Sequence, residues 1–176
     1  MTWRTHLVGG LASLALIPFE ISSTSLALFC LFAALGSLLP DLDARVSKLS
    51  TMEVGGMTLL KPAAQALNRH LGHRGAFHSL ATLLLVAIVI GLPLSLFLDP
   101  FAGVGLVLGF VSHLLLDACT RSGIPLWWPS NQRTHFLPYR LRITTGSQVE
   151  DAIFFLLAVA TVFFLLQSSH LFSPTY

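Results

Sequence analysis

Long apolar runs set the pattern of this chain. Four of them are each built on a stretch without Asp, Glu, Lys or Arg, and we predict membrane spans at 22–39, 79–98, 100–118 and 152–169. Crossing a bilayer core of about 30 Å takes ~20 mostly apolar residues, which these runs supply. Asp99 and Pro100 fall between the second and third run, so we expect a tight turn there.

A fifth predicted span covers 3–19, where the pattern is weaker. Its clean apolar core, 7–17, is short, and Arg4 and His6 lie near its start. A secretory signal peptide has the same general layout, with a basic start and a short apolar segment. No small-residue cleavage site follows Phe19 and Glu20, so a fifth span is favoured.

Composition supports a membrane protein. The chain is 54% hydrophobic but only 10% charged, whereas soluble domains are roughly 25% charged. This excludes a soluble domain, and a net charge of +2 gives no reason to expect nucleic acid as a partner. We therefore predict an all-α, polytopic helix bundle, with 1–176 forming a single membrane-embedded domain. Apolar residues at helical spacing within 60–71 add an amphipathic helix at the membrane interface.

Basic residues indicate the orientation. With five spans, the N-terminus, the 40–78 loop and the 117–151 loop share one side of the membrane. Lys and Arg mark the cytoplasmic side, so we expect this side in the cytoplasm and the C-terminus outside. All ten basic residues fall there: Arg4, Arg45, Lys48, Lys61, Arg69, Arg74, Arg121, Arg133, Arg140 and Arg142.

Histidines and carboxylates gather at the same cytoplasmic ends of the predicted spans. His113 and Asp117 are four residues apart and share one helix face. Taken singly, such residues are commonly solvated helix ends or hydrogen-bonded pairs, but their convergence at one depth favours a divalent metal site. Imidazole and carboxylate donors without clustered cysteine favour zinc, with manganese or iron as alternatives. The predicted ligands are His6, Asp41, Asp43, His73, His78, His113 and Asp117.

At these residues the chain resembles the YdjM family, LexA-regulated inner-membrane proteins described as metal-dependent hydrolases. The resemblance extends from residue 5 to about 150. It rests on Thr5-His6, the stretch Leu38–Asp43, His73-Arg74-Gly75 with His78-Ser79, the stretch Ser112–Asp117, Trp128-Pro129, and Thr145–Ser147 with Glu150. It implies a location in the bacterial inner membrane and a hydrolase that uses divalent metal, without implying a substrate.

We expect one or two ions at a site open to the cytoplasmic leaflet. Three residues are candidates for catalysis. Asp43 is a ligand or a general base, Arg74 binds an anionic group, and Glu150 either acts in catalysis or completes a helix-capping box with Ser147. Basic loops attract anionic headgroups, so a phosphoester of a lipid or lipid-linked molecule is the expected substrate, with membrane lipids as partners.

The competing interpretation is a transporter or ion pathway, because intramembrane His and Asp are also usual there. A pathway needs polar residues through both halves of the bilayer. Here the outer half has only Glu20, Asp99 and His170, all near the outer ends. The sequence gives no indication of the oligomeric state.

Overall fold

The computed structural model describes residues 1–17, 21–43 and 76–168, with only the backbone described at 42 and 43. Its α-helices are α1 (Trp3–Ala12), α2 (Ser23–Leu38), α4 (Leu80–Val86), α5 (Leu92–Phe97), α6 (Pro100–Ala118) and α7 (Gln148–Ser168). A π-helical turn, Ala87–Gly91, joins α4 to α5, and short 3-10 turns are η1 (Ser13–Leu16), η2 (Leu39–Asp43), η3 (Ala76–His78) and η5 (Tyr139–Leu141). The described part of the chain is an all-α membrane protein.

Four helical segments of this part are long and apolar enough to cross a membrane: Ser23–Asp41, Leu80–Phe97, Pro100–Ala118 and Gln148–Ser168. They coincide closely with the predicted runs at 22–39, 79–98, 100–118 and 152–169. Helix α7 begins at Gln148, four residues before the predicted span, because Ser147, Gln148 and Glu150 form a helix start ahead of the apolar run.

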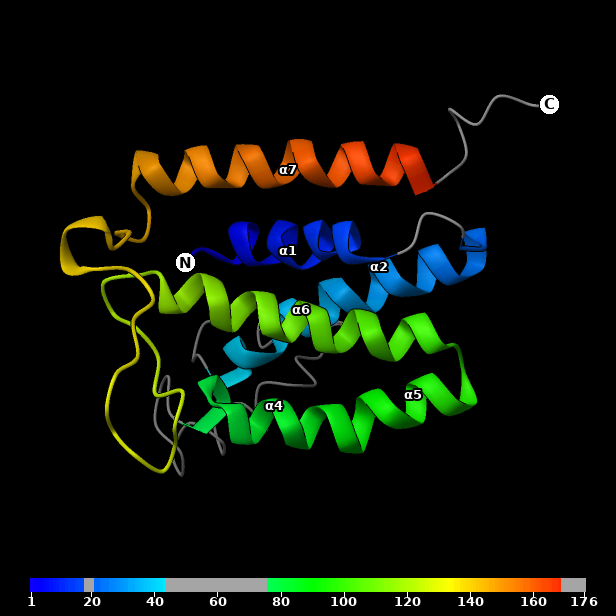
Figure 1. Cartoon of the computed structure of the whole chain (residues 1–176), viewed down its shortest axis with the longest axis horizontal. Coiled ribbons are helices and arrows are strands. Elements are labelled where there is room, and N and C mark those ends of the chain that lie inside the picture. Colours follow the sequence, from blue (N-terminus) through cyan, green and yellow to red (C-terminus); the bar gives the residue numbers. More distant parts are fainter. Residues whose placement is uncertain (18–20, 44–75, 169–176) are drawn as a thin grey trace, which may run out of the picture.

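The predicted span at 3–19 has a different form. Helix α1 ends at Ala12 and η1 continues only to Leu16. At 1.5 Å per α-helical residue and about 2 Å per 3-10 residue, the pair extends roughly 23 Å, less than the ~30 Å of a bilayer core. The segment formed by α1 and η1 is therefore not one of the four described segments that are long enough to cross the membrane. Instead α1 packs between α7, α2 and α6 inside the bundle (Figure 1).

Helix α6 is the centre of the bundle. More than half of its span is buried (56%), against 6% for the α4–α5 span and 11% for α7, whose exposed faces are apolar. Its largest interface is with α2, and small residues allow the close approach. A Cβ at Gly105 would lie 2.6 Å from the carbonyl oxygen of Phe29, and one at Gly109 would overlap that of Ala33. The spacing of Gly105 and Gly109 matches a helix-contact motif.

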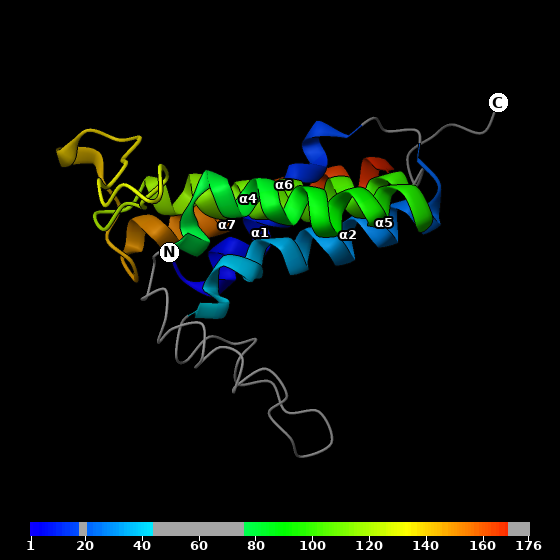
Figure 2. The ribbon, with the colours of Figure 1, turned by 90° about the horizontal axis from the view of Figure 1, so that it is seen from below.

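The two ends of the bundle differ. At one end, Asp99 forms the predicted tight turn, with its Oδ1 accepting a hydrogen bond from the Phe101 amide at 2.8 Å. At the other end lies the long connection 119–147, together with the starts of α1, α4 and α7 and the end of α6. Figures 1 and 2 both place this connection, in yellow, beyond the helix ends. The polar side chains described next lie at this second end.

Candidate metal centre

Buried His and Asp side chains from four elements meet at the end of the bundle that carries the 119–147 connection. His6, His78, His113 and Asp117 are fully buried, while the Asp41 side chain is 24% exposed. The contributing elements are α1 for His6, η2 for Asp41, η3 for His78, and α6 for His113 and Asp117. Two groups of three among these residues are spaced so that each could hold a metal ion.

Four donor atoms face one another at the centre of this cluster. The Nε2 atoms of His78 and His113 are 3.2 Å apart. Oδ1 of Asp41 lies 3.7 Å from His78 Nε2 and 3.8 Å from His113 Nε2. Oδ2 of Asp117 likewise lies 3.7 Å from His78 Nε2 and 3.8 Å from His113 Nε2.

These separations fit a single small cation. Zinc bonds to imidazole nitrogen and carboxylate oxygen are about 2.0–2.2 Å, so the edges of a tetrahedral site are about 3.3–3.6 Å. Five edges of the four-donor set lie between 3.2 and 3.8 Å. A hydrogen bond between the two imidazoles would satisfy that pair alone and leave two partly or fully buried carboxylates facing them. A divalent cation is better matched to the whole set.

The orientation of His113 is fixed by the backbone. Its Nδ1 lies 2.7 Å from the carbonyl oxygen of Ser37 in α2. A carbonyl only accepts hydrogen bonds, so Nδ1 must be the donor and carry the proton. In the neutral ring the lone pair then lies on Nε2, which points into the cluster. Such a contact is the usual support of a metal-binding histidine.

The same contact limits how many ions His113 can serve. Both groups of three contain this residue: His6, Asp41 and His113 form one, while His78, His113 and Asp117 form the other. With Nδ1 bonded to Ser37, only Nε2 is available for coordination. An ion bound by either group through His113 would therefore leave the other group without this donor.

His6 contacts the outer side of Asp117. Its Nε2 lies 3.3 Å from Oδ1 of Asp117, whereas Oδ2 is the oxygen that faces His78 and His113. The Met1 amino group also donates to Oδ1. In addition, the His6 ring stacks on His113, with ring centroids 3.6 Å apart and planes 14° from parallel. His6 is thus placed either as a further donor or as the support of Asp117.

Comparison with known proteins places this arrangement in a family. A family model described as "YdjM inner membrane protein" matches residues 1–172. The chain belongs to the YdjM family. This confirms the resemblance inferred from the motifs.

Individual proteins also match the chain. The YvsG protein of Bacillus subtilis (strain 168) is 30% identical over 170 residues, which cover 97% of this chain and 98% of that protein. The inner membrane proteins YdjM of Escherichia coli (strain K12) and Shigella flexneri are each 36% identical over 135 residues. Those residues cover 74% of this chain and 63% of each relative. No solved structure matches the chain.

Glu150 of this YdjM-family chain contacts the N-terminal segment. Its Oε1 accepts hydrogen bonds from the Thr2 amide at 2.5 Å and the Thr5 hydroxyl at 2.8 Å, and its Oε2 accepts one from the Gly146 amide at 2.7 Å. The Glu150 amide lies 3.4 Å from Ser147 Oγ, which is one half of the expected capping box. The carboxylate therefore ties the start of α7 to α1.

Other predicted residues lie outside the described part. His73 and Arg74 are among them, as are the side chain of Asp43 and the expected interfacial helix within 60–71. Conversely, sequence reasoning assigned no role to the Ser37 carbonyl or to Thr5. Nothing in the sequence marks the carbonyl, because every residue has one. Thr5 stands in the Thr5-His6 motif of the YdjM family, which was the available signal.

Proposed function

We propose that this protein is a membrane-bound, metal-dependent hydrolase with its centre at the cytoplasmic face. The observation that carries the proposal is the convergence of His78, His113, Asp41 and Asp117 at 3.2–3.8 Å inside a membrane bundle. An ionisable group within an apolar helix raises the free energy of the protein in the membrane unless it is paired, and such groups commonly mark functional sites. Membership of the YdjM family and the family's motif set support the same interpretation.

We further propose that these four residues bind one ion, with zinc favoured because the donors are two imidazoles and two carboxylates. When bound, a divalent cation supplies a water of lowered pKa and polarises the bond to be cleaved. The site opens at Asp41, the one described member of the set that is partly exposed. Because a catalytic zinc site keeps one position for water or substrate, the four-donor set would need Asp41, its partly exposed member, to give up its place or the ion to take a fifth ligand.

The proposed substrate is a phosphoester of a lipid or lipid-linked molecule. Its support is the position of the cluster at the end of the membrane helices, together with the basic connection 119–147. Cytoplasmic leaflets carry anionic headgroups, and arginine binds phosphate oxygens well. Asp43, His73 and Arg74 remain proposed participants as additional ligands, general base and phosphate-binding residue.

Metal analysis tests the site, and turnover tests the reaction. We expect purified protein to hold about one divalent ion per chain, and Asp41→Asn to lose it. His135→Ala is the matched control, because His135 lies in the 119–147 connection and outside the cluster. Metal-free wild-type protein after gentle purification would remove the main support for the proposal.

The bond that the protein cleaves is identified by measuring product release from short-chain lipids that contain a phosphomonoester, a phosphodiester, a carboxylic ester or an amide. We expect metal-dependent release from a phosphoester that is absent in Asp41→Asn. Turnover of another bond type alone would overturn the phosphoester assignment but not the hydrolase. Metal binding without any turnover, combined with metal-dependent ion flux in vesicles, would instead support an ion pathway.

A further inference from the structure

An apolar hollow lies beside the metal centre. It has a volume of about 100 Å³ and is lined only by apolar side chains. Two of these, Leu80 and Leu114, are close in the chain to His78 and His113, so hollow and centre share the same helix segments. The remaining walls come from α4, from the last turns of α6, and from Leu126 and Phe136 of the 119–147 connection.

Backbone hydrogen bonds fix the connection over this hollow. The Phe136 amide donates to the carbonyl of Ala118 at the end of α6 (3.0 Å), and the Leu80 amide donates to the carbonyl of Leu126 (3.0 Å). A further pair of hydrogen bonds joins Ile124 to Thr134, at 2.8 and 3.2 Å. The wall is thus built into the fold, since it uses groups that end α6 and begin α4.

The connection is basic and lacks acidic residues. Between Ala118 and Val149 the sequence has four arginines and neither Asp nor Glu. Arg121, Arg133 and Arg140 are exposed. The backbone brings two of them, Arg121 and Arg133, toward the end of α6, because the Arg121 amide donates to the Ile143 carbonyl and Arg133 precedes Thr134, which pairs with Ile124.

Aromatic side chains complete the surface. Trp127 is 63% exposed, Trp128 44% and Tyr139 72%. Tryptophan and tyrosine concentrate at the headgroup level of membranes, where an apolar ring meets a polar layer. An apolar hollow, exposed aromatic rings and arginines that belong to the same connection are the complement of a phospholipid with an anionic headgroup.

We propose that the hollow and the arginines of the 119–147 connection form a binding site for an anionic phospholipid. A short stretch of one acyl chain lies in the hollow, and the headgroup phosphate is held by the arginines. A soluble phosphate would make no use of the apolar walls, and so the lipid is the better-matched occupant. Binding does not require a catalytic metal. Only the further step, in which this lipid is the molecule hydrolysed, rests on the proposed function.

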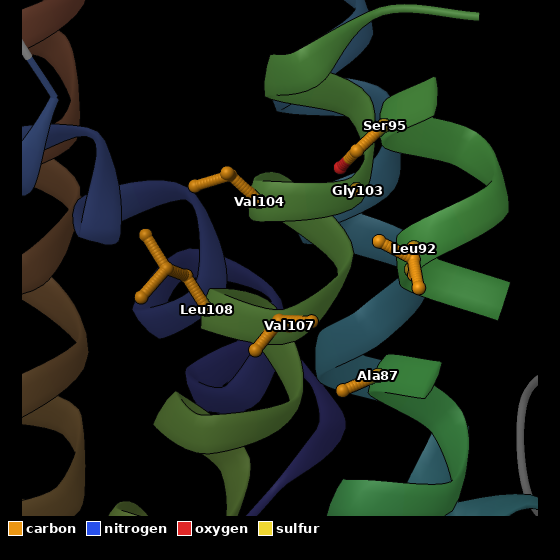
Figure 3. Close-up of a pocket in the computed structure, with 8 residues that line it drawn as sticks. Ala87, Leu92, Ser95, Gly103, Val104, Val107 and Leu108 are labelled. Atoms are coloured by element: carbon orange, nitrogen blue, oxygen red, sulfur yellow. The ribbon is translucent and has the colours of Figure 1, made fainter. Parts of the chain in front are cut away.

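A second hollow offers an internal comparison. It lies between the α4–α5 segment and α6, is lined by residues including Ala87, Leu92, Gly103 and Val107, and has a volume of about 290 Å³ (Figure 3). It is larger and also apolar, but the sequence from 75 to 120 contains no Lys or Arg. Both hollows have apolar walls that suit hydrocarbon, whereas of the two only the first has arginines in the connection that forms its wall.

The test uses two lipids with the same photoreactive diazirine acyl chain, one with a phosphatidylglycerol and one with a phosphatidylcholine headgroup. Each is added in trace amount to phosphatidylcholine nanodiscs that hold the full-length, chelator-treated protein, and the labelled peptides are mapped. We expect the phosphatidylglycerol probe to label the peptide containing Leu126 and Phe136 at least threefold more than its counterpart. The hollow of Figure 3 should be labelled equally by both.

The variant Arg133→Gln/Arg140→Gln should reduce this headgroup preference to nearly onefold, while Arg4→Gln, outside the connection, should retain it. Equal labelling of wild-type protein by the two probes overturns the proposal, as does a preference that survives in the double variant. Metal content and hydrolysis are measured on separate samples. Loss of turnover with retained lipid preference therefore counts against the proposed function and not against this site.

Discussion

Single atoms decide the chemistry of this centre. The His113 and His6 rings stack on each other but are held differently: His113 is fixed through Nδ1 to the Ser37 carbonyl, whereas Nε2 of His6 lies 3.3 Å from the outer oxygen of Asp117. The arrangement separates a residue that offers its lone pair to the centre from one that supports a ligand. Substituting the two residues should therefore reduce metal affinity by different amounts.

We expect His113→Ala to abolish stoichiometric metal binding, because it removes a donor from the four-atom set. His6→Ala should weaken affinity by about 10- to 100-fold, the usual cost of losing an outer support. Isothermal titration with zinc in detergent measures both, and His135→Ala should titrate like wild type. An equally complete loss in His6→Ala would assign His6 to the donors themselves.

At the next scale, the elements set where those atoms lie. The centre joins α1 and α6 to the turns η2 and η3, so the packing of α2 on α6 controls the distance between Asp41 and His113. Gly109 is one of the tightest positions in this interface, since a Cβ there would overlap the Ala33 carbonyl. Gly91 gives a milder case, with its nearest neighbour a Val107 methyl carbon 3.1 Å away.

Gly109→Ala is expected to destabilise the protein by about 1–3 kcal/mol, the typical cost of overpacking, and to lower metal affinity by separating α2 from α6. Gly91→Ala makes the same chemical change in another membrane helix and should cost clearly less. Thermal denaturation in detergent, with and without zinc, gives both quantities. Identical melting temperatures for the two variants would contradict this account of the α2–α6 interface.

Helix α1 depends on α7 through Glu150, which is 1% exposed and accepts three hydrogen bonds. Glu150→Ala leaves those donors unsatisfied and should destabilise the protein on the order of 2 kcal/mol. Metal affinity should fall in parallel, because α1 carries His6. Glu150→Gln retains an acceptor and should recover part of the stability.

A catalytic role for Glu150 makes a different prediction from this structural one. Turnover at saturating metal would then be lost in Glu150→Gln even though stability and metal content recover. Measuring kcat beside melting temperature and zinc stoichiometry separates the two roles. We expect kcat to follow metal occupancy.

The elements also show what sequence can predict. Apolar runs predicted the long helices well because length and hydropathy alone decide whether a segment crosses a bilayer. The tight turn at Asp99 was predicted equally well, because an aspartate directly before a proline is a local sequence signal for a turn. The form of α1 was harder: its apolar core is short, and its position depends on contacts with α2, α6 and α7. The same holds for Glu150, whose partners Thr2 and Thr5 lie almost a whole chain away.

For the molecule as a whole, charge distribution sets orientation. All described arginines lie near the start of α1 or in the 119–147 connection, at the end of the bundle with the candidate metal centre, and Asp99 lies in the turn before α6 at the other end. Lys and Arg are retained on the cytoplasmic side during insertion. The proposed orientation therefore places the 119–147 connection inside the cell and the Asp99 turn outside.

Cysteine labelling tests this orientation in a variant whose native Cys30 and Cys119 are replaced. In intact cells a membrane-impermeant maleimide should label Leu98→Cys, beside the Asp99 turn, because Leu98 is 55% exposed. It should not label Gln132→Cys, an exposed position in the connection, until the membrane is permeabilised. The reverse pattern would invert the topology and place the metal centre outside.

The hydrogen bonds from Thr2 and Thr5 to Glu150 also bear on how the protein is made. Every ligand described for the centre has been synthesised once Asp117 leaves the ribosome, yet the carboxylate that holds α1 follows 33 residues later. Until then, α1 has its contacts with α2 and α6 but lacks those with α7. Membrane insertion of α7 is thus the step that completes the surroundings of α1, so we expect the finished protein to bind metal more tightly than a chain that ends before Glu150.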